Sequence, residues 1–241
     1  DPKLRFALSF HPLFVGGNPF KVTSIYGLIA FLERRHGVHF AMGGTGRIVE
    51  GMVGLIERQG NEVRYEAEVA DVTVENRAAT GVRLASGELI KADIVVSNAD
   101  AAWTYRKLVP PSARKRWSDK KIDRANYSMG LFVWYFGTSR RYPDVKHHTI
   151  LLGPRYKELV TDIFKHRVLA DDFSLYLHRP TATDPLLAPE GCDAFYVLSP
   201  VPHLDAGIDW TTKADEYRRA IAEVLDSVAL PGFHDHIVTS R

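Results

Sequence analysis

The chain has 241 residues, of which 45% are hydrophobic and 25% charged, and its formal net charge is +2. These proportions are ordinary for a globular protein and exclude a long disordered tail, a collagen and a coiled coil. The small net charge argues against a nucleic-acid-binding domain. No apolar run approaches the ~20 residues that a membrane-spanning helix needs. The single cysteine, Cys192, excludes a disulfide framework and any zinc site built from several cysteines.

The N-terminal part predicts two helices, each preceded by a loop rich in glycine. Residues 11–20 form the first loop, and apolar residues at helical spacing follow from the candidate N-cap Ser24 to Gly37. Residues 43–46 form the second loop, and an apolar stripe over residues 48–56 predicts the second helix.

Two glycines, Gly51 and Gly54, interrupt this second helix, where each costs about 1 kcal/mol relative to Ala. Close packing against another helix is the simplest explanation for them. The loop before the helix, residues 43–46, either approaches a cofactor or merely caps the helix. Its sequence comes near the G-x-G-x-x-G pattern but has Val49 in place of the last glycine. The chain therefore does not by itself carry a dinucleotide phosphate site.

A compact run of strands follows. Residues 63–69 alternate apolar and polar side chains, which predicts a half-buried strand. Residues 71–92 predict three further short strands joined by tight turns, which form a β-meander. Residues 94–96 are continuously apolar, as in a strand buried on both faces.

The remaining chain alternates helices and strands without a strict βαβ order. This pattern predicts an α+β fold, with a mixed sheet and flanking helices. Helices are predicted at 101–109, 156–165 and 214–228, and strands at 129–136, 149–152, 173–178 and 195–199.

No common catalytic motif is present: the sequence has no P-loop, H-E-x-x-H, G-x-S-x-G or EF-hand loop. His147 and His148 are adjacent, so on a strand their side chains would point to opposite faces and could not readily share a metal ion. We therefore expect no metal site. Structural hydrogen bonding is the default role for His11, His178 and His203.

The predicted strand 129–136 carries bulky apolar residues on both faces. One face holds Phe132, Trp134 and Phe136. Two interpretations remain open, because these aromatic residues either pack in the core or form the wall of a hydrophobic ligand cavity. A basic stretch around Trp117 likewise has two interpretations, a solvated helix face or a surface that docks on an anionic membrane.

Several long strings of this sequence resemble the bacterial and fungal type of phytoene desaturase, within the monoamine-oxidase-like flavoproteins. They run HPLFVGGNPF from His11, SIYGLI from Ser24, GGTGRIVEGM from Gly43, VVSNADAAWTYRKL from Val95, LFVWYFG from Leu131, HHTILLGPRYKELVTDIF from His147, and DFSLYLHRPTATDPLLAPEGCDAFYVLSPVPHL from Asp172. The resemblance covers almost the whole chain.

The resemblance implies an FAD-dependent oxidoreductase of carotenoid biosynthesis, which dehydrogenates phytoene to neurosporene or lycopene. It also implies a division into a substrate domain, residues 1–41 and 106–241, and part of a split FAD-binding domain, residues 42–105. The β-meander would belong to the FAD domain. The implied partners are a polyene substrate and the inner face of a bacterial membrane, to which a cytoplasmic protein would bind peripherally; no nucleic acid is expected.

The resemblance also implies site residues. By position, Val69, Asn98 and Ala99 would contact FAD. The wall of the substrate site would include Phe132, Trp134, Phe136 and Tyr176.

No catalytic residue is assigned, since Asp100, Tyr105 and His178 qualify as an acid or base by their chemistry alone. A long hydrocarbon needs a dry apolar channel, and the cofactor would carry the redox step.

The chain departs from the family because it lacks the N-terminal G-x-G-x-x-G region and the C-terminal glycine-rich segment near the flavin. It also begins with Asp1 rather than Met. We therefore expect an internal piece of a longer parent protein, inactive by itself. Alternatives are another carotenoid desaturase, a carotenoid isomerase, a retinol saturase, or a non-catalytic module that binds a hydrophobic ligand. The sequence leaves the oligomeric state open.

Overall fold

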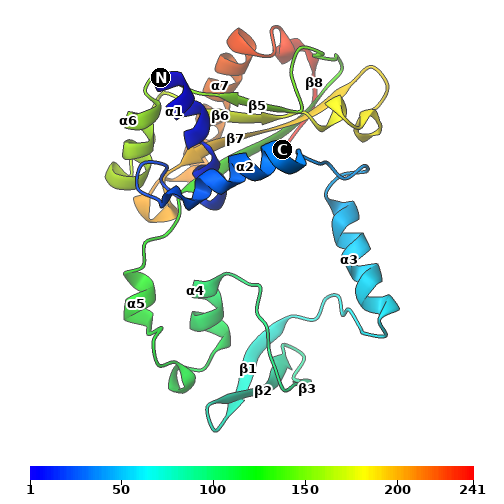
Figure 1. Cartoon of the computed structure of the whole chain (residues 1–241), viewed down its shortest axis with the longest axis vertical. Coiled ribbons are helices and arrows are strands. Elements are labelled where there is room, and N and C mark those ends of the chain that lie inside the picture. Colours follow the sequence, from blue (N-terminus) through cyan, green and yellow to red (C-terminus); the bar gives the residue numbers. More distant parts are fainter. The chain divides into compact units, whose positions relative to one another are not determined.

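The computed structural model describes residues 1–241, apart from the side chains of residues 2 and 3, and the chain divides into two compact units. Unit 1 combines residues 1–51 with residues 127–241, and unit 2 is residues 52–126 (Figure 1). The chain therefore leaves unit 1, forms unit 2 and returns.

Unit 1 is built on a five-stranded antiparallel sheet with the strand order β5-β6-β7-β4-β8. The two longest strands, β4 and β7, pair along their whole length, from Gly130 opposite Val201 to Thr138 opposite Asp193. The strands are β4 (Gly130–Thr138), β5 (His148–Leu151), β6 (Leu175–His178), β7 (Asp193–Val201) and β8 (Ile237–Ser240).

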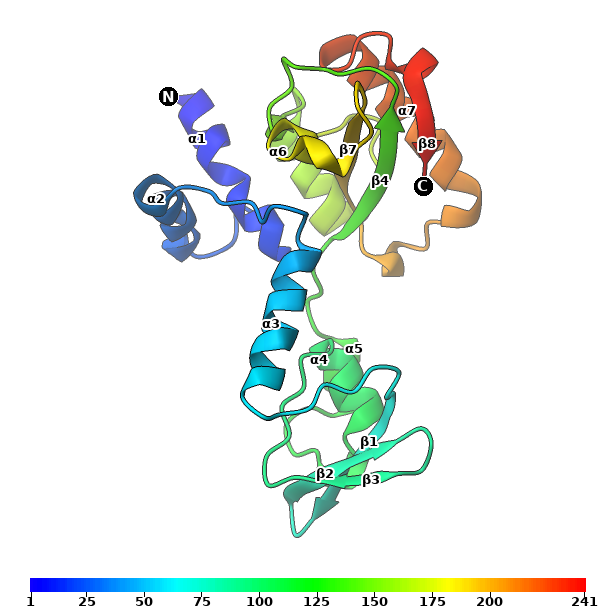
Figure 2. The same cartoon turned by 90° about the vertical axis from the view of Figure 1, so that its right-hand side faces the viewer.

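The helices of unit 1 lie on both sides of this sheet (Figure 2). Helix α7 packs on one face. Its first turn is capped by Asp209, whose carboxylate accepts a hydrogen bond from the Thr211 amide at 3.0 Å. The helices are α1 (Pro2–Ser9), α2 (Gly27–His36), α6 (Tyr156–Thr161) and α7 (Trp210–Val228), while α3 (Gly46–Arg58) spans the boundary between the units. No helix among the described residues is long and apolar enough to cross a membrane.

The main hydrophobic core lies between this sheet and α7. Trp134 and Phe136 of β4 are 1% and 3% exposed, and they pack with Phe233, Ile221 and Leu225. Trp134 and Phe136 alternate along β4, and Ile221 and Leu225 recur at helical spacing along α7, so each element contributes one continuous apolar face. The core side of the sheet is therefore the side that carries the Trp134 side chain.

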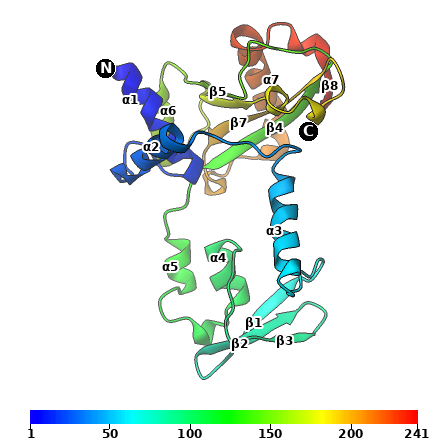
Figure 3. The ribbon, with the colours of Figure 1, turned by 45° about the vertical axis from the view of Figure 1, so that its right-hand side comes forward.

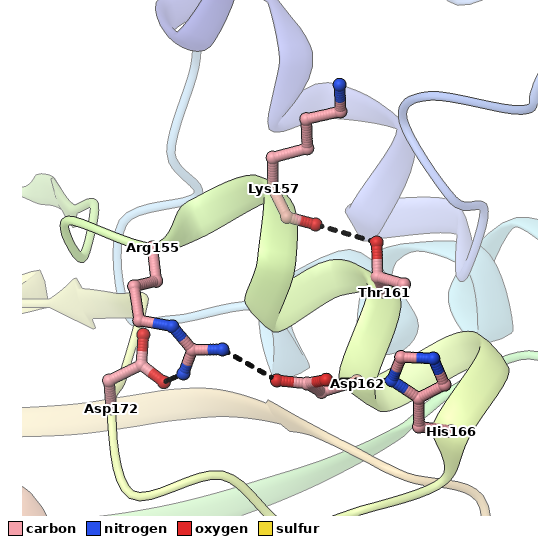
Figure 4. A network of polar contacts seen from close by, with 6 residues as sticks. All are labelled: Arg155, Lys157, Thr161, Asp162, His166 and Asp172. Carbon is pink, nitrogen blue, oxygen red and sulfur yellow. Dashed lines mark hydrogen bonds and ion pairs between the residues drawn. The ribbon is translucent and has the colours of Figure 1, made fainter.

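A polar network holds α6 and its neighbouring loop together (Figure 4). The Arg155 guanidinium donates hydrogen bonds to Asp172 at 2.9 Å and to Asp162 at 3.0 Å. His166 pairs with the other Asp162 oxygen at 3.0 Å. Hydrogen bonding to His166 and Arg155 lowers the pKa of the Asp162 carboxyl. The network fixes the helix that presents Tyr156 to the sheet.

Unit 2 contains a three-stranded antiparallel sheet with the order β1-β2-β3 (Figure 3). Its strands are β1 (Val69–Glu75), β2 (Ala78–Leu84) and β3 (Leu89–Lys91), followed by the short helices α4 (Ala101–Trp103) and α5 (Asp119–Asp123). Gly81 has a φ of +150°, and a Cβ there would lie 2.1 Å from the Ile90 carbonyl oxygen. Only glycine fits this close approach between β2 and β3.

Most predicted elements are confirmed, including the β-meander, and the α+β class holds with every paired strand antiparallel rather than in a mixed sheet. Two predicted strands are wrong. Residues 61–68 are irregular and pair with no strand of the described chain, and the Arg64 side chain there pairs with Glu62 and Glu88. Residues 94–96 pair with no strand of the described chain, and Ile94 is 79% exposed.

The helix-packing explanation for Gly51 and Gly54 finds no partner helix. Apart from the helix's own backbone and the adjacent residues, no atom of the described chain lies within 4 Å of a Cβ built at Gly51, and the atoms near one at Gly54 belong to Arg58 of the same helix.

Candidate functional site

The sheet face opposite α7 carries the candidate site of unit 1. Side chains from neighbouring strands form rows across this face, because paired residues point the same way. One row joins Ile150, Tyr176, Leu198 and Val133 through the registers of β5, β6, β7 and β4. The next row in one direction begins with Leu131 opposite Pro200.

An apolar cavity of about 140 Å³ opens on this part of the face. Its floor is the sheet, and its other walls come from the N-terminal segment and from α6. The lining residues are Phe10, Leu13, Phe14, Met129, Leu131, Ile150, Leu152, Tyr156, Ser174, Leu175, Tyr176, Leu198 and Pro200. Phe14 meets the Tyr176 ring edge-on at 5.8 Å, so the N-terminal segment closes directly over β6. A cavity with such walls suits a hydrocarbon and offers few hydrogen bonds.

A third row lies next to the row of Ile150 and Tyr176, on the side away from Leu131, and it is polar and aromatic. His148, His178, Tyr196 and Tyr135 are joined by the strand registers, on the same face as Tyr176. His148 Nδ1 lies 2.6 Å from the Tyr176 hydroxyl oxygen. Tyr176 lines the cavity and contacts His148, so its side chain connects the cavity to the polar row.

His147 joins this row although it precedes β5. Its Nε2 lies 2.8 Å from His178 Nε2, and its Nδ1 lies 2.5 Å from the Thr183 hydroxyl oxygen. The three imidazoles of His147, His148 and His178 each present a nitrogen within 4.8 Å of the others. The expectation that His147 and His148 point apart is wrong, because strand alternation does not apply to a residue outside the strand.

Desolvation, partial for His147 and His148 and stronger for His178, sets the protonation states of this cluster. Desolvation lowers the pKa of His147 and His148 below the ordinary value. Burial, with the neighbouring imidazoles, lowers the pKa of His178 to about 4. Burial also raises the pKa of the Tyr176 hydroxyl. Near neutral pH the cluster therefore holds three neutral imidazoles and a neutral phenol.

The structure separates the four residues predicted to line the substrate site. Tyr176 lines the cavity. Trp134 and Phe136 lie in the core beneath α7, and Phe132 packs against Trp210 on that same side. The cavity wall on β4 is instead formed by Leu131, from the alternate face.

The residues predicted to contact a cofactor all lie in unit 2. Val69 begins β1, an edge strand, and is half-buried. Asn98 and Ala99 are exposed in the extended segment that leads to α4.

The three acid or base candidates have different surroundings. The Asp100 carboxylate caps α4 and accepts a hydrogen bond from the Trp103 amide at 2.8 Å. Tyr105 stacks on Trp117 with ring centroids 5.7 Å apart. Only His178 lies in the polar row beside the cavity.

Comparison with known proteins finds no matching family model, but it finds relatives across nearly the whole chain. A neurosporene-forming phytoene desaturase of Cereibacter sphaeroides is 53% identical over 98% of this chain and 46% of its own length. A lycopene-forming phytoene desaturase of a Paracoccus species is 49% identical over 100% of this chain and 48% of its own length.

Solved structures agree in fold. An oxidoreductase from Methanosarcina mazei matches 98% of this chain and 51% of its own, with a TM-score of 0.68 at 20% identity. A protein from Pyrococcus furiosus matches 99% of this chain and 53% of its own, with the same TM-score at 16% identity. The chain thus spans about half the length of the relatives that it matches. By sequence it is a homologue of about half of each of these phytoene desaturases.

Proposed function

We propose that this chain forms about half of an FAD-dependent phytoene desaturase, which dehydrogenates phytoene to more conjugated carotenes such as neurosporene or lycopene. The observation that carries the proposal is an apolar cavity, on one sheet face, in a chain about half identical to enzymes of that name. A chain that supplies only this half is proposed to be inactive by itself.

The cavity is proposed to bind one segment of the hydrocarbon. Its volume of about 140 Å³ is close to that of an apolar protein cavity of about 150 Å³ that stays dry and binds benzene. A long polyene would therefore place only a few carbons there and extend along the open face beyond it. Leu131, Ile150 and Leu198 would exclude water from the bound segment.

Unit 1 is proposed to be the substrate domain, and unit 2 to be part of a split FAD-binding domain. Two features of unit 2 fit such a role. One side of β1 has no partner strand in the described chain, so its backbone from Val69 onward is free to meet another group. The exposed Asn98 amide forms no hydrogen bond among the described residues and is free to bind FAD beside Ala99.

The chemistry that FAD supplies when bound is acceptance of a hydride from an allylic carbon. This chain would hold the hydrocarbon straight and dry. The loss of a proton needs an acceptor, and the neutral His148 and His178 lie beside the cavity behind the Tyr176 hydroxyl. Titratable groups with shifted pKa values at a cavity edge are typical of acid–base chemistry.

A membrane-facing role is proposed for the basic stretch of unit 2. Trp117, Lys120, Lys121 and Arg124 line one hollow, with the Lys121 ammonium 4.9 Å from the Trp117 ring centroid. Cations beside an amphipathic ring suit the headgroup region of an anionic bilayer. Such docking would give the enzyme access to a substrate dissolved in the membrane.

A chimaera tests the proposal. This chain replaces the homologous half of the Cereibacter sphaeroides relative, which supplies the remaining sequence, and the purified chimaera receives FAD and phytoene in liposomes. We expect structured visible absorption bands to grow, since each added conjugated bond moves the polyene band to longer wavelength. A chimaera that binds FAD but leaves phytoene colourless contradicts the proposed substrate. One that desaturates another carotenoid or a retinoid identifies the replacement.

A further inference from the structure

The histidine cluster of unit 1 has a geometry that its hydrogen bonds alone do not explain. His147 Nε2 and His178 Nε2 face one another at 2.8 Å, and His148 brings a third imidazole nitrogen within 4.8 Å. Three imidazole side chains in one place can offer three nitrogen lone pairs as ligands.

The outer hydrogen bonds of two histidines leave their inner nitrogens free as ligands. His148 Nδ1 lies 2.6 Å from the Tyr176 hydroxyl oxygen and His147 Nδ1 lies 2.5 Å from the Thr183 hydroxyl oxygen, and each of these oxygens can accept a proton donated by the ring. With the proton on Nδ1, each Nε2 carries a lone pair. Metal-binding histidines in proteins show the same arrangement, since the second ring nitrogen donates to a partner that orients the ring.

His178 supplies an independent observation. It is 8% exposed, and its buried Nδ1 has no hydrogen-bond partner among the described residues. Phe40 covers the pair of His147 and His178, with its ring centroid 4.7 Å from that of His147. The carboxylate of Glu33 acts on His148 through space and supplies nearby negative charge.

We propose that His147, His148 and His178 bind a first-row divalent cation, with Zn²⁺ as the first candidate. Imidazole nitrogens suit Zn²⁺, and three protein ligands leave a fourth position for water. Two imidazoles on one tetrahedral Zn²⁺ place their nitrogens about 3.3 Å apart at the usual Zn–N distance of about 2.0 Å. His147 and His178 therefore need to separate by about half an ångström. The cation would link β5, β6 and the turn that carries Thr183.

The test of this site is independent of the proposed desaturase activity, because it measures binding to unit 1. A bound cation would occupy the lone pairs of His148 and His178 and so exclude them as the proton acceptor proposed above. The tag-free 241-residue chain is stripped of metal with a chelator, and CoCl₂ alone is added. We expect one equivalent of Co²⁺ to produce the intense visible bands of a tetrahedral site, and ZnCl₂ to displace it.

The variants separate a built site from weak binding at the chain's other histidines. His148 is exposed, so His148→Ala keeps the fold, and we expect it to weaken Co²⁺ and Zn²⁺ binding at least 100-fold. Thr183→Val and Tyr176→Phe remove only the outer partners, and we expect each to weaken binding about 10- to 100-fold. His234→Ala, at an exposed histidine elsewhere in unit 1, should leave the affinity unchanged.

Circular dichroism of each variant shows that the fold is retained. Failure of the folded chain to bind one equivalent of Co²⁺ or Zn²⁺ overturns the proposal. So does binding that His148→Ala leaves intact, because the cation then lies elsewhere.

Discussion

A buried ion pair in unit 1 gives the sharpest test of how this fold is held together. Asp193, at the start of β7, is 1% exposed and pairs with Arg179 at 2.8 Å. The same carboxylate accepts hydrogen bonds from the Tyr142 amide at 2.8 Å and the Thr181 hydroxyl at 2.6 Å. It therefore joins the end of β6 and the loop after β4 to β7. We predict that Asp193→Ala strongly destabilises unit 1.

The size of the loss follows from what the substitution leaves behind. The buried Arg179 keeps one acceptor, the Val145 carbonyl oxygen at 2.9 Å. Removing one partner of a buried ion pair costs about 3–5 kcal/mol, because the other charge stays desolvated. An unpaired buried amide at Tyr142 adds to this loss. We expect a decrease of about 4 kcal/mol in the free energy of unfolding of unit 1.

Hydrogen exchange followed by mass spectrometry, in increasing urea, measures this quantity for β4 and β7 peptides specifically. Asp215→Ala is the matched control, because Asp215 forms an exposed pair with Arg218 one helical turn away and should show no measurable change. Adding Arg179→Met to Asp193→Ala should recover part of the loss, since the uncompensated cation is gone. A loss below about 1 kcal/mol for Asp193→Ala would refute the reasoning.

Three further predictions address the cavity, the core and unit 2. In the chimaera, Leu131→Glu puts a charge on the cavity wall and should lower the rate of phytoene desaturation about tenfold or more. The control Leu186→Glu, at a 92% exposed position outside the cavity, should leave the rate unchanged. Equal effects of the two substitutions would contradict the cavity assignment. Burial raises the pKa of the Tyr217 hydroxyl to about 12 in the folded protein, whereas in the unfolded chain this hydroxyl ionises near pH 10. The free energy of unfolding of the wild type should therefore fall by up to about 3 kcal/mol between pH 10 and 12. In urea unfolding, Tyr217→Phe should lose correspondingly less over that range, and parallel curves would exclude this cause. Gly81→Ala drives a Cβ into the β3 backbone and should destabilise the β1–β2 peptides by about 3 kcal/mol in hydrogen exchange. The control Gly51→Ala, in open space on a helix, should be neutral or stabilising. A tolerated Gly81→Ala would show that β3 can move away.

The sequence predicts most helices and strands because their apolar residues repeat at the expected periods, as along α7 and β4. It cannot choose the core face of β4, since Trp134 and Leu131 both belong to apolar faces. That choice depends on which side α7 covers, a long-range contact that no local pattern encodes.

The lack of a partner strand explains why the two strand predictions are wrong. A period-2 pattern or an apolar run gives a segment that can enter a sheet, but a strand also needs a partner. Neither residues 61–68 nor residues 94–96 pair with a strand of the described chain. Pairing is decided outside the segment, so the same pattern has different outcomes.

The histidine cluster shows the same limit at the level of a site. His147 and His148 were expected to diverge, and the register that places His178 opposite His148 is invisible in the sequence. The residue types did carry a signal, because Tyr176 and His178 alternate along one predicted strand and Tyr196 lies on another. Polar-tipped aromatic side chains on one strand face indicate the side away from a dry core.

The most direct test of the central claim follows cofactor and substrate together in the chimaera. Phytoene in liposomes is added without oxygen or another electron acceptor, and one spectrum records both the flavin and the polyene. The account predicts that the oxidised flavin absorbance falls as conjugated polyene bands appear, in equal amounts for the first new double bond. A flavin that stays oxidised with phytoene unchanged, while the unmodified Cereibacter sphaeroides relative reacts, would contradict the proposal that this chain builds the desaturase substrate site.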